Sequence, residues 1–456
     1  MTTAKRLALI FLAVLVLLAP PQPAQAKTIK VGDGTAASCT EAALRNALIF
    51  AGGEKSSVIQ FKCGAAPVTI TVTATLTVPD NTKIDGNGLI TLDGQFSILA
   101  SILRVERDTT VALADLTISR GGSTVRCCGS GGGLLNEGTV TIHRCSFSNN
   151  VTGSGGGIFN LGTLVVHDST FSDNLAEAGG GIFNQGTLTV DDSTFSGNRG
   201  FSTGGGIFSQ GTLAVRGSTF AGNGGTFGAG IFAEGTLTVH DSVVDGNNPS
   251  PSLVAQQSLV PLGTPSGAIH LGTGTHAIAH STISRNFGNE NGGGINLLAG
   301  TLTVRNSTIT QNTAHFGAGI HVHPLTPEGA TLVVKHSTIS GNRGSEGGGI
   351  VNHGGSITIN DSIITQNAAD TGGGIATDGG TLTVKGSSIS ENTATTFGGG
   401  IYNNSSSAVT LAVRDSAITQ NTAGSDGGGI YTVAGRIPPE LINTLVTNNT
   451  PNDIAP

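Results

Sequence analysis

Short stretches of alternating apolar and polar residues recur along most of the chain. In one copy, residues 187–190 read Thr-Leu-Thr-Val and residues 194–196 read Thr-Phe-Ser. An alternation with period two places the apolar side chains on one face of a β-strand. Dipeptides such as Asp191-Asp192 separate the paired stretches and are typical of turns. The pattern therefore predicts several short strands in each unit of about 24 residues.

Two signatures recur in phase with these strands. The first is a glycine triplet, or Gly-Ala-Gly, that precedes an apolar residue, with a weaker copy ending at Ile269. The apolar residues of this first signature are Leu134, Ile158, Ile182, Ile207, Ile231, Ile295, Ile320, Ile350, Ile375, Ile401 and Ile430. The second is an asparagine three residues after an apolar position, at Asn150, Asn174, Asn198, Asn223, Asn247, Asn286, Asn312, Asn342, Asn367, Asn392, Asn421 and Asn448.

A unit of this size cannot bury its own apolar face, but a stack of such units can. We therefore predict an all-β, parallel β-helix of about twelve regular coils, with rungs about 4.8 Å apart. We expect an N-terminal cap and irregular first coils over residues 27–95, followed by the regular repeats over residues 96–450. A proline-rich loop at 249–265 interrupts the repeats, and 451–456 form a short tail. Residues 41–50 have the apolar spacing of a short helix that caps the N-terminal end.

The recurring asparagines and glycines are expected to be structural. A coil turns a sharp corner at the same place each time, and glycine supplies the positive φ that such a corner needs. An asparagine at a buried corner can bond to its own backbone and to the copies above and below. We assign this structural role to the asparagine column, which includes Asn174, Asn198, Asn223, Asn312 and Asn342.

Both signatures resemble the repeats of right-handed parallel β-helix proteins, and in particular the G-G-A-I and F-x-x-N repeats of polymorphic outer membrane protein passengers. Residues 39–45 (CTEAALR) also resemble a diverged form of the C-S-L-R-E-A segment that opens many such exported chains. The resemblance covers about residues 131–450 and implies a right-handed coil and a cell-surface setting. The sequence reaches Pro456 directly after the last repeat, and we expect no transmembrane anchor in the mature chain.

The N-terminus predicts export. Lys5 and Arg6 precede an apolar run, and Ala24-Gln25-Ala26 forms a small-residue cleavage site, so residues 1–26 are expected to be a signal peptide. The oxidising compartment outside the cell permits disulfides. We expect a bridge between Cys39 and Cys63 and a second one between Cys128 and Cys145, which leaves one thiol unpaired.

Composition excludes several classes of protein. Of 456 residues, 71 are glycine and only 11% are charged, whereas coiled coils and charged disordered chains carry far more charge. The formal net charge of −7 gives no basic stripe for nucleic acid. We expect an extracellular polysaccharide or a surface protein as the partner, and a monomeric chain.

Candidate catalytic and metal-binding residues are few. Five aspartates precede a serine in the same turn position, at Asp168, Asp192, Asp241, Asp361 and Asp415. Other copies have glycine, histidine or asparagine there, which indicates turn propensity. The alternative is a Ca²⁺-binding or catalytic role for Asp168 and Asp192. His321 and His323 have the spacing of two ligands on one strand face, but a pair alone does not define a metal site. We therefore assign no catalytic residue, no metal and no cofactor.

The residue after the recurring Ile varies and is expected to point outward. Four consecutive copies have phenylalanine at this position, namely Phe159, Phe183, Phe208 and Phe232. The pattern predicts an exposed file of aromatic rings along the solenoid. Exposed aromatic side chains can stack on sugars or engage a protein partner. The leading prediction is a secreted or surface-located, non-enzymatic binding protein of adhesin type. A polysaccharide lyase or glycoside hydrolase and a purely structural surface rod are the alternatives.

Overall fold

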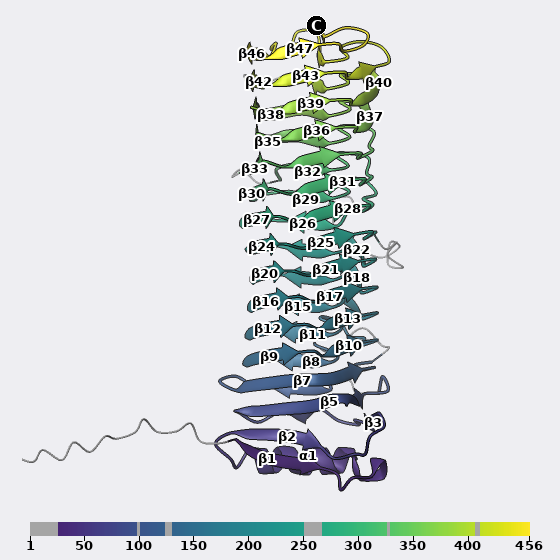
Figure 1. Ribbon diagram of the computed structural model, residues 1–456, viewed down its shortest axis with the longest axis vertical. Coiled ribbons are helices and arrows are strands. Elements are labelled where there is room, and N and C mark those ends of the chain that lie inside the picture. Colours follow the sequence, from purple (N-terminus) through teal and green to yellow (C-terminus); the bar gives the residue numbers. More distant parts are fainter. Residues whose placement is uncertain (1–25, 98–100, 124–129, 250–266, 326–328, 406–410) are drawn as a thin grey trace, which may run out of the picture.

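One coil of the chain consists of short strands joined by tight corners. In a representative coil these are β15 (Ile182–Asn184), β16 (Thr187–Asp191), β17 (Thr194–Ser196) and β18 (Arg199–Thr203). The computed structural model describes residues 26–97, 101–123, 130–249, 267–325, 329–405 and 411–456. Within these ranges the chain winds into a β-solenoid of about fifteen coils, which rises from the N-terminal to the C-terminal end in Figure 1.

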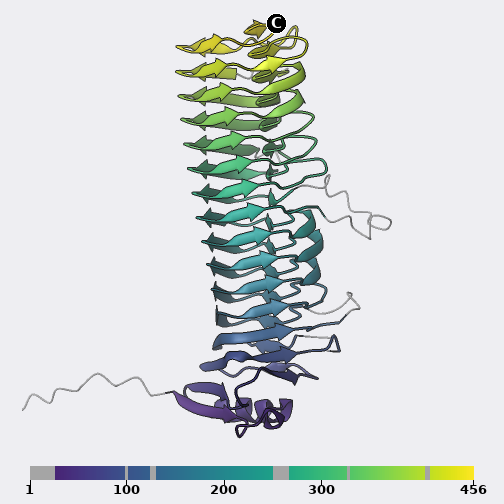
Figure 2. The same ribbon diagram turned by 45° about the vertical axis from the view of Figure 1, so that its right-hand side comes forward.

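Each strand pairs in parallel with the equivalent strand of the next coil, so that like residues stack. In β11 (Ile158–Asn160) and β15, for example, isoleucine faces isoleucine, phenylalanine faces phenylalanine and asparagine faces asparagine. The five-residue strands β12 (Thr163–His167), β16 and β20 (Thr212–Arg216) stack in the same way. Figure 2 shows these strands as regular files along the axis. The stacking satisfies the backbone hydrogen bonds that a single short strand would leave open.

The interior is one continuous hydrophobic core. The recurring isoleucines, such as Ile182 and Ile207, and the inward-facing Leu and Val residues of the five-residue strands, such as Leu188, are fully buried in it. At its centre, Phe171 and Phe195 stack with their ring centroids 4.6 Å apart, and Phe195 and Phe220 stack at 4.7 Å. The alternation seen in the sequence thus separates the core-facing residues from the outward-facing ones.

The two ends of the solenoid differ. At the N-terminal end, α1 (Glu41–Ala51) packs Leu44, Ala47 and Leu48 into the same core beside β1 (Lys27–Val31) and β2 (Ser57–Phe61), at the foot of Figure 1. The Thr40 side chain caps this helix by accepting a hydrogen bond from the Ala43 amide. At the other end, β48 (Ile454–Ala455) pairs with β45 (Ile430–Thr432), so the predicted tail adds to the sheet.

The predicted all-β parallel solenoid with an N-terminal helix is confirmed. Irregular coils precede the predicted regular coils and include the long strands β5 (Thr82–Asp93) and β7 (Thr110–Ser119). The predicted signal peptide and the 249–265 loop lie almost entirely outside the described residues. No helix of the described ranges is long and apolar enough to cross a membrane.

Candidate ligand-binding corner of the solenoid

One corner of the coil carries titratable side chains that recur along the surface of the solenoid. It lies where a five-residue strand such as β12 gives way to a three-residue strand such as β13 (Thr170–Ser172). The first corner residue, here called the corner slot, has a φ of 47° to 59° in the coils from Asp115 to Asn443. The slots are Asp115, Arg144, Asp168, Asp192, Gly217, Asp241, His280, Asn306, His336, Asp361, Gly386, Asp415 and Asn443.

The positive φ explains the choice of residues in the slot. Glycine, asparagine and aspartate tolerate this left-handed conformation best, so the mixture follows backbone geometry first. Because the conformation is the same in each coil, the slot side chains leave the corner in one row along the solenoid. The interpretation of Asp168 and Asp192 as turn residues agrees with their φ values of 49° and 47°.

A buried serine ladder holds the corner in place. The residue after the slot is usually serine, and its hydroxyl oxygen accepts a hydrogen bond from the backbone amide of the serine one coil below. The Ser169 amide donates to Ser193 Oγ at 3.1 Å, and Ser193 Oγ donates to the Asp191 carbonyl at 2.8 Å. The ladder runs from the Cys145 amide to Ser416 Oγ. It satisfies backbone groups that the kinked corner would otherwise leave unpaired.

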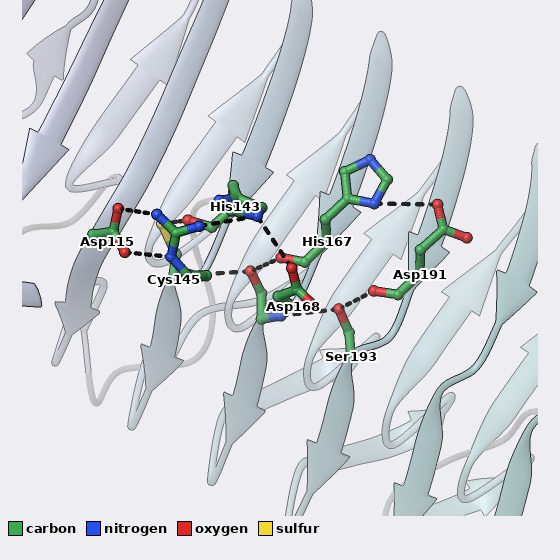
Figure 3. A network of polar contacts seen from close by, with 9 residues as sticks. Asp115, His143, Cys145, His167, Asp168, Asp191 and Ser193 are labelled. Atoms are coloured by element: carbon green, nitrogen blue, oxygen red, sulfur yellow. Dashed lines mark hydrogen bonds and ion pairs between the residues drawn. The ribbon is translucent and has the colours of Figure 1, made fainter.

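The first coils of the corner carry a charged network, shown in Figure 3. The Arg144 guanidinium donates two hydrogen bonds of 2.7 Å to Asp115 in the coil below. His143 Nε2 lies 3.2 Å from Arg144 Nη1 and 3.1 Å from Asp168 Oδ2 in the coil above. Arg144, His143 and Asp168 are all more than a third exposed. The network therefore brings two carboxylates, an imidazole and a guanidinium to the surface across three coils.

The arginine fixes the charge of its partner. The hydrogen bonds from Arg144 hold the pKa of Asp115 below its usual value, an effect that burial partly opposes. The carboxylate thus stays ionised under mildly acidic conditions. One coil higher, His167 Nδ1 and Asp191 Oδ2 form a similar contact at 3.2 Å.

The last coils of the corner form a shallow surface groove, here called the corner groove. Its polar lining includes the slot residues Asp361, Asp415 and Asn443. Asn443 Nδ2 donates to Asp415 Oδ1 at 2.9 Å. Its apolar lining includes Ile363, which is 47% exposed, and Leu445, which is 58% exposed. The groove crosses four successive coils, and Gly386 leaves a gap in the row of slot side chains.

The predicted aromatic file is mostly buried, so the expectation of exposed rings is wrong for three of its four members. Phe183, Phe208 and Phe232 are 7%, 6% and 8% exposed, and only Phe159 is half-buried. Neighbouring rings pack against one another with centroids 4.8 to 5.0 Å apart, stacked for Phe159 and Phe183 and at steep angles in the other two pairs. They point away from the main core, as predicted, but a small flanking sheet of β14 (Leu175–Ala178), β18 and β22 (Gly224–Phe227) covers them. Ligand binding by the file stays a prediction, with Phe159 as its accessible end.

The asparagine column is a hydrogen-bonded ladder inside the solenoid. Asn198 Oδ1 accepts from both the backbone amide and the side-chain amide of Asn174. Asn198 Nδ2 donates to the Phe171 carbonyl and to Asn223 Oδ1. Asn312 and Asn342 repeat this pattern, and all these side chains are buried. The last member is Asn449, not the predicted Asn448, because Asn449 Oδ1 accepts from Asn421.

The cysteines are only partly as predicted. Cys39 and Cys63 form a disulfide, as expected. Cys145 is a buried free thiol, so the prediction that it forms a disulfide is wrong. Cys128, its expected partner, lies outside the described residues. The physical reason is that Cys145 takes a serine position in the corner, where its thiol donates to the His143 carbonyl at 3.5 Å. Burial raises the pKa of Cys145 to about 12.

Several features escaped the sequence analysis. The corner serines were visible as a recurrent residue after the slot, but their role depends on stacking. A second buried ladder runs through Asn136, Asn160 and Asn184. His353 joins His321 and His323 from the next coil, about thirty residues away, which no local motif reveals. Among the described residues, the clusters of three or more metal-ligating groups include neither Asp168 nor Asp192. These two aspartates therefore have no further ligand nearby that would support a Ca²⁺ site.

Comparison with known proteins concerns the fold. A model of the right-handed beta helix region matches residues 101–264 and 266–451. No curated protein matches the sequence. One similar solved structure is the A-module of the mannuronan C-5 epimerase AlgE6 from Azotobacter vinelandii, at 14% identity and a TM-score of 0.32, covering 91% of this chain and 96% of that one. Another is the catalytic unit of a GH87 alpha-1,3-glucanase from Streptomyces thermodiastaticus, at 16% identity and a TM-score of 0.38. The match covers 94% of this chain and 70% of that one. Similarity at this level says nothing about activity.

Proposed function

The chain belongs to the family of right-handed β-helix proteins, and we propose that it is an exported, non-enzymatic binding protein that holds an extended polysaccharide along its corner. The observation that carries the proposal is the corner groove, where polar and apolar side chains of four successive coils lie in one row. Fold alone assigns no function, whereas the chemistry of this row is specific to the residues that line it.

The groove has the two kinds of group that sugars engage. The carboxylates of Asp361 and Asp415 accept hydrogen bonds and the amide of Asn443 both donates and accepts, which suits sugar hydroxyls. Ile363 and Leu445 offer exposed aliphatic surface for the C–H face of a sugar ring. A few polar groups beside apolar surface are typical of ligand sites.

The shape of the row favours a polymer over a small molecule. Equivalent positions repeat at the rung spacing of about 4.8 Å, and residues of four successive coils line the groove. A chain molecule laid along the corner would meet one coil after another and add contacts with length. A surface protein is the other class of partner, and a purely structural rod would bind neither.

Location outside the cell is part of the proposal. The signal-peptide pattern of residues 1–26 supports export, and the Cys39–Cys63 disulfide fits an oxidising compartment. The resemblance of the repeats to polymorphic outer membrane protein passengers supports a place at the outer cell surface.

The test is a glycan array probed with the mature chain, followed by titration of each retained polysaccharide. We expect Asp415→Asn and the pair Ile363→Ser with Leu445→Ser to weaken binding at least tenfold. Glu391→Gln neutralises an exposed carboxylate outside the groove and is the matched control. Failure to retain any glycan, or equal binding by the groove variants and the control, would overturn the proposal.

A polysaccharide lyase or glycoside hydrolase is the second candidate function. The observation that favours it is the Asp115–Arg144–His143–Asp168 network, because such enzymes use carboxylates together with a basic group. Incubation with pectin and alginate in the presence of Ca²⁺ should then release unsaturated products or reducing ends. Loss of that release in His143→Ala, but not in His336→Ala, would replace the non-enzymatic proposal by this one.

A further inference from the structure

Three histidines meet on the outer side of the solenoid, away from the corner groove. His321 lies on β32 (Ile320–Val322), His323 follows that strand, and His353 lies one coil further on β35 (Ile350–Asn360). One ring nitrogen from each lies within 4.8 Å of the other two. His321 Nε2 and His353 Nδ1 are 3.1 Å apart. His321 is 1% exposed, whereas the other two are half-buried, so the cluster opens on one side.

The tautomer of His321 follows from its partner. Asn296, on β29 (Ile295–Leu297), places its Oδ1 2.8 Å from His321 Nδ1. An amide oxygen only accepts, so His321 Nδ1 carries the proton. The lone pair of His321 Nε2 therefore faces His353. Asn296 is itself held in this orientation, because its Nδ2 donates to His270 Nδ1 at 3.2 Å.

The far nitrogen of His353 is also oriented. His353 Nε2 lies 3.6 Å from Glu346 Oε1, and the carboxylate favours a proton on that nitrogen. The lone pair of His353 Nδ1 then faces the lone pair of His321 Nε2 across 3.1 Å. Two lone pairs at this distance repel each other unless a cation lies between them. Two of the three imidazoles thus have an outer group behind them, an amide for His321 and a carboxylate for His353, and such groups orient metal-ligating histidines.

We propose that His321, His323 and His353 bind one divalent first-row transition metal ion, with Zn²⁺ as the best fit. Zn–N bonds of about 2.0–2.1 Å in tetrahedral geometry separate two ligand nitrogens by about 3.3–3.4 Å. The 3.1 Å between His321 and His353 is close to that separation. Three histidines leave the fourth position for water or for an oxygen ligand. The site ties two coils together and is independent of the corner groove.

The surroundings of His321 and His323 favour the neutral form of the imidazole, which is the form that binds metal. Burial, reinforced by the neighbouring histidines, holds the pKa of His321 well below its usual value and also lowers the pKa of His323. The Phe316 ring lies beside the cluster, with its centroid 5.5 Å from that of His353 and 6.3 Å from that of His321.

A second cluster serves as a comparison. His240, Asp241 and His280 also bring three potential ligands within 4.8 Å, at the corner. His280 Nδ1 and His240 Nε2 are 3.1 Å apart, but Asp241 and His280 are exposed. Asn306 Nδ2 lies 3.1 Å from His280 Nε2 and donates to it, so that nitrogen already has a partner. His240 Nδ1 lies 2.7 Å from Asp241 Oδ2, so the carboxylate of this cluster is one of its own three groups. The cluster also lacks the buried setting of the first.

The experiment is calorimetric titration of the metal-free, full mature chain with ZnCl₂, with visible absorption on Co²⁺ substitution as a second readout. We expect one site whose affinity falls at least 100-fold in His353→Ala and about 10- to 100-fold in Asn296→Ala. Glu346→Ala should weaken binding, and Glu346→Gln, which keeps an acceptor, should restore most of it. His240→Ala should leave the affinity unchanged.

Two results would overturn the proposal. One is that the wild-type chain binds neither Zn²⁺ nor Co²⁺, in which case a proton alone occupies the space between the two lone pairs. The other is that His240→Ala removes the binding while His353→Ala retains it. Far-UV circular dichroism of each variant in EDTA separates loss of the site from loss of the fold.

Discussion

Replacement of Asn342 by alanine tests how much the asparagine ladder stabilises the solenoid. Asn342 Oδ1 accepts from the backbone amide and the side-chain amide of Asn312, each at 3.0 Å. Asn342 Nδ2 donates to the Ile309 carbonyl at 3.0 Å and to Asn367 Oδ1 at 2.9 Å. The alanine variant therefore leaves two buried donors of Asn312 without this acceptor and removes a donor from Ile309.

The magnitude follows from those orphaned groups. Each buried polar group that loses its partner costs about 1–3 kcal/mol, so the two donors of Asn312 alone cost about 2–6 kcal/mol. The free energy of unfolding should fall by that amount, because no side chain of the variant reaches the vacated position. Solenoids unfold through coupled neighbouring coils, so the loss should extend to the coils on both sides.

Urea unfolding followed by circular dichroism measures the change, and amide hydrogen exchange locates it. Asn360→Ala is the matched control, because that side chain leaves β35 toward solvent and should change stability by less than about 0.5 kcal/mol. A loss below about 1 kcal/mol for Asn342→Ala, or one equal to that of the control, would refute the reasoning.

Three further predictions concern the core and the cysteines. Phe195→Ala should cost about 3–5 kcal/mol in urea unfolding, because its ring is fully buried between two stacked rings, and a cost below 1 kcal/mol would contradict this. Reduction of Cys39–Cys63, which closes a 24-residue separation, should cost about 3 kcal/mol and speed hydrogen exchange mainly in β1 and α1. Cys145 should resist iodoacetamide at pH 8 until denaturant is added, as peptide mapping will show, because it is buried with a pKa of about 12.

The repeating part of the fold was readable because each local signal agreed with the next. The recurring isoleucine, the asparagine three residues after an apolar position and the alternating strands all kept the same phase. Stacking such units is the only way for them to bury their apolar faces, so the solenoid followed. The slot aspartates were also readable, since glycine, histidine and asparagine replace them in other coils at the same positive φ.

The predictions from the sequence were wrong or incomplete where contacts between different coils determine the surroundings of a residue. The position of Phe183 on its strand showed that the ring points out of the main core, but not that residues of β14 and β22 would pack around the file of rings. Asn448 and Asn449 both fit the local pattern, and only the pairing to Asn421 distinguishes them. His353 meets His321 because the coils stack in register, so the cluster exists in space and not in any sequence motif.

The dependence of affinity on the length of the carbohydrate tests the central claim most directly. Oligosaccharides of increasing length, cut from a polysaccharide that the chain retains, are titrated into the wild-type protein by calorimetry. If a polymer lies along the corner groove, affinity rises with each added sugar until the four coils are covered, and Asp415→Asn lowers it at every length. Affinity that is already complete with a monosaccharide, or that is indifferent to Asp415, would contradict the account.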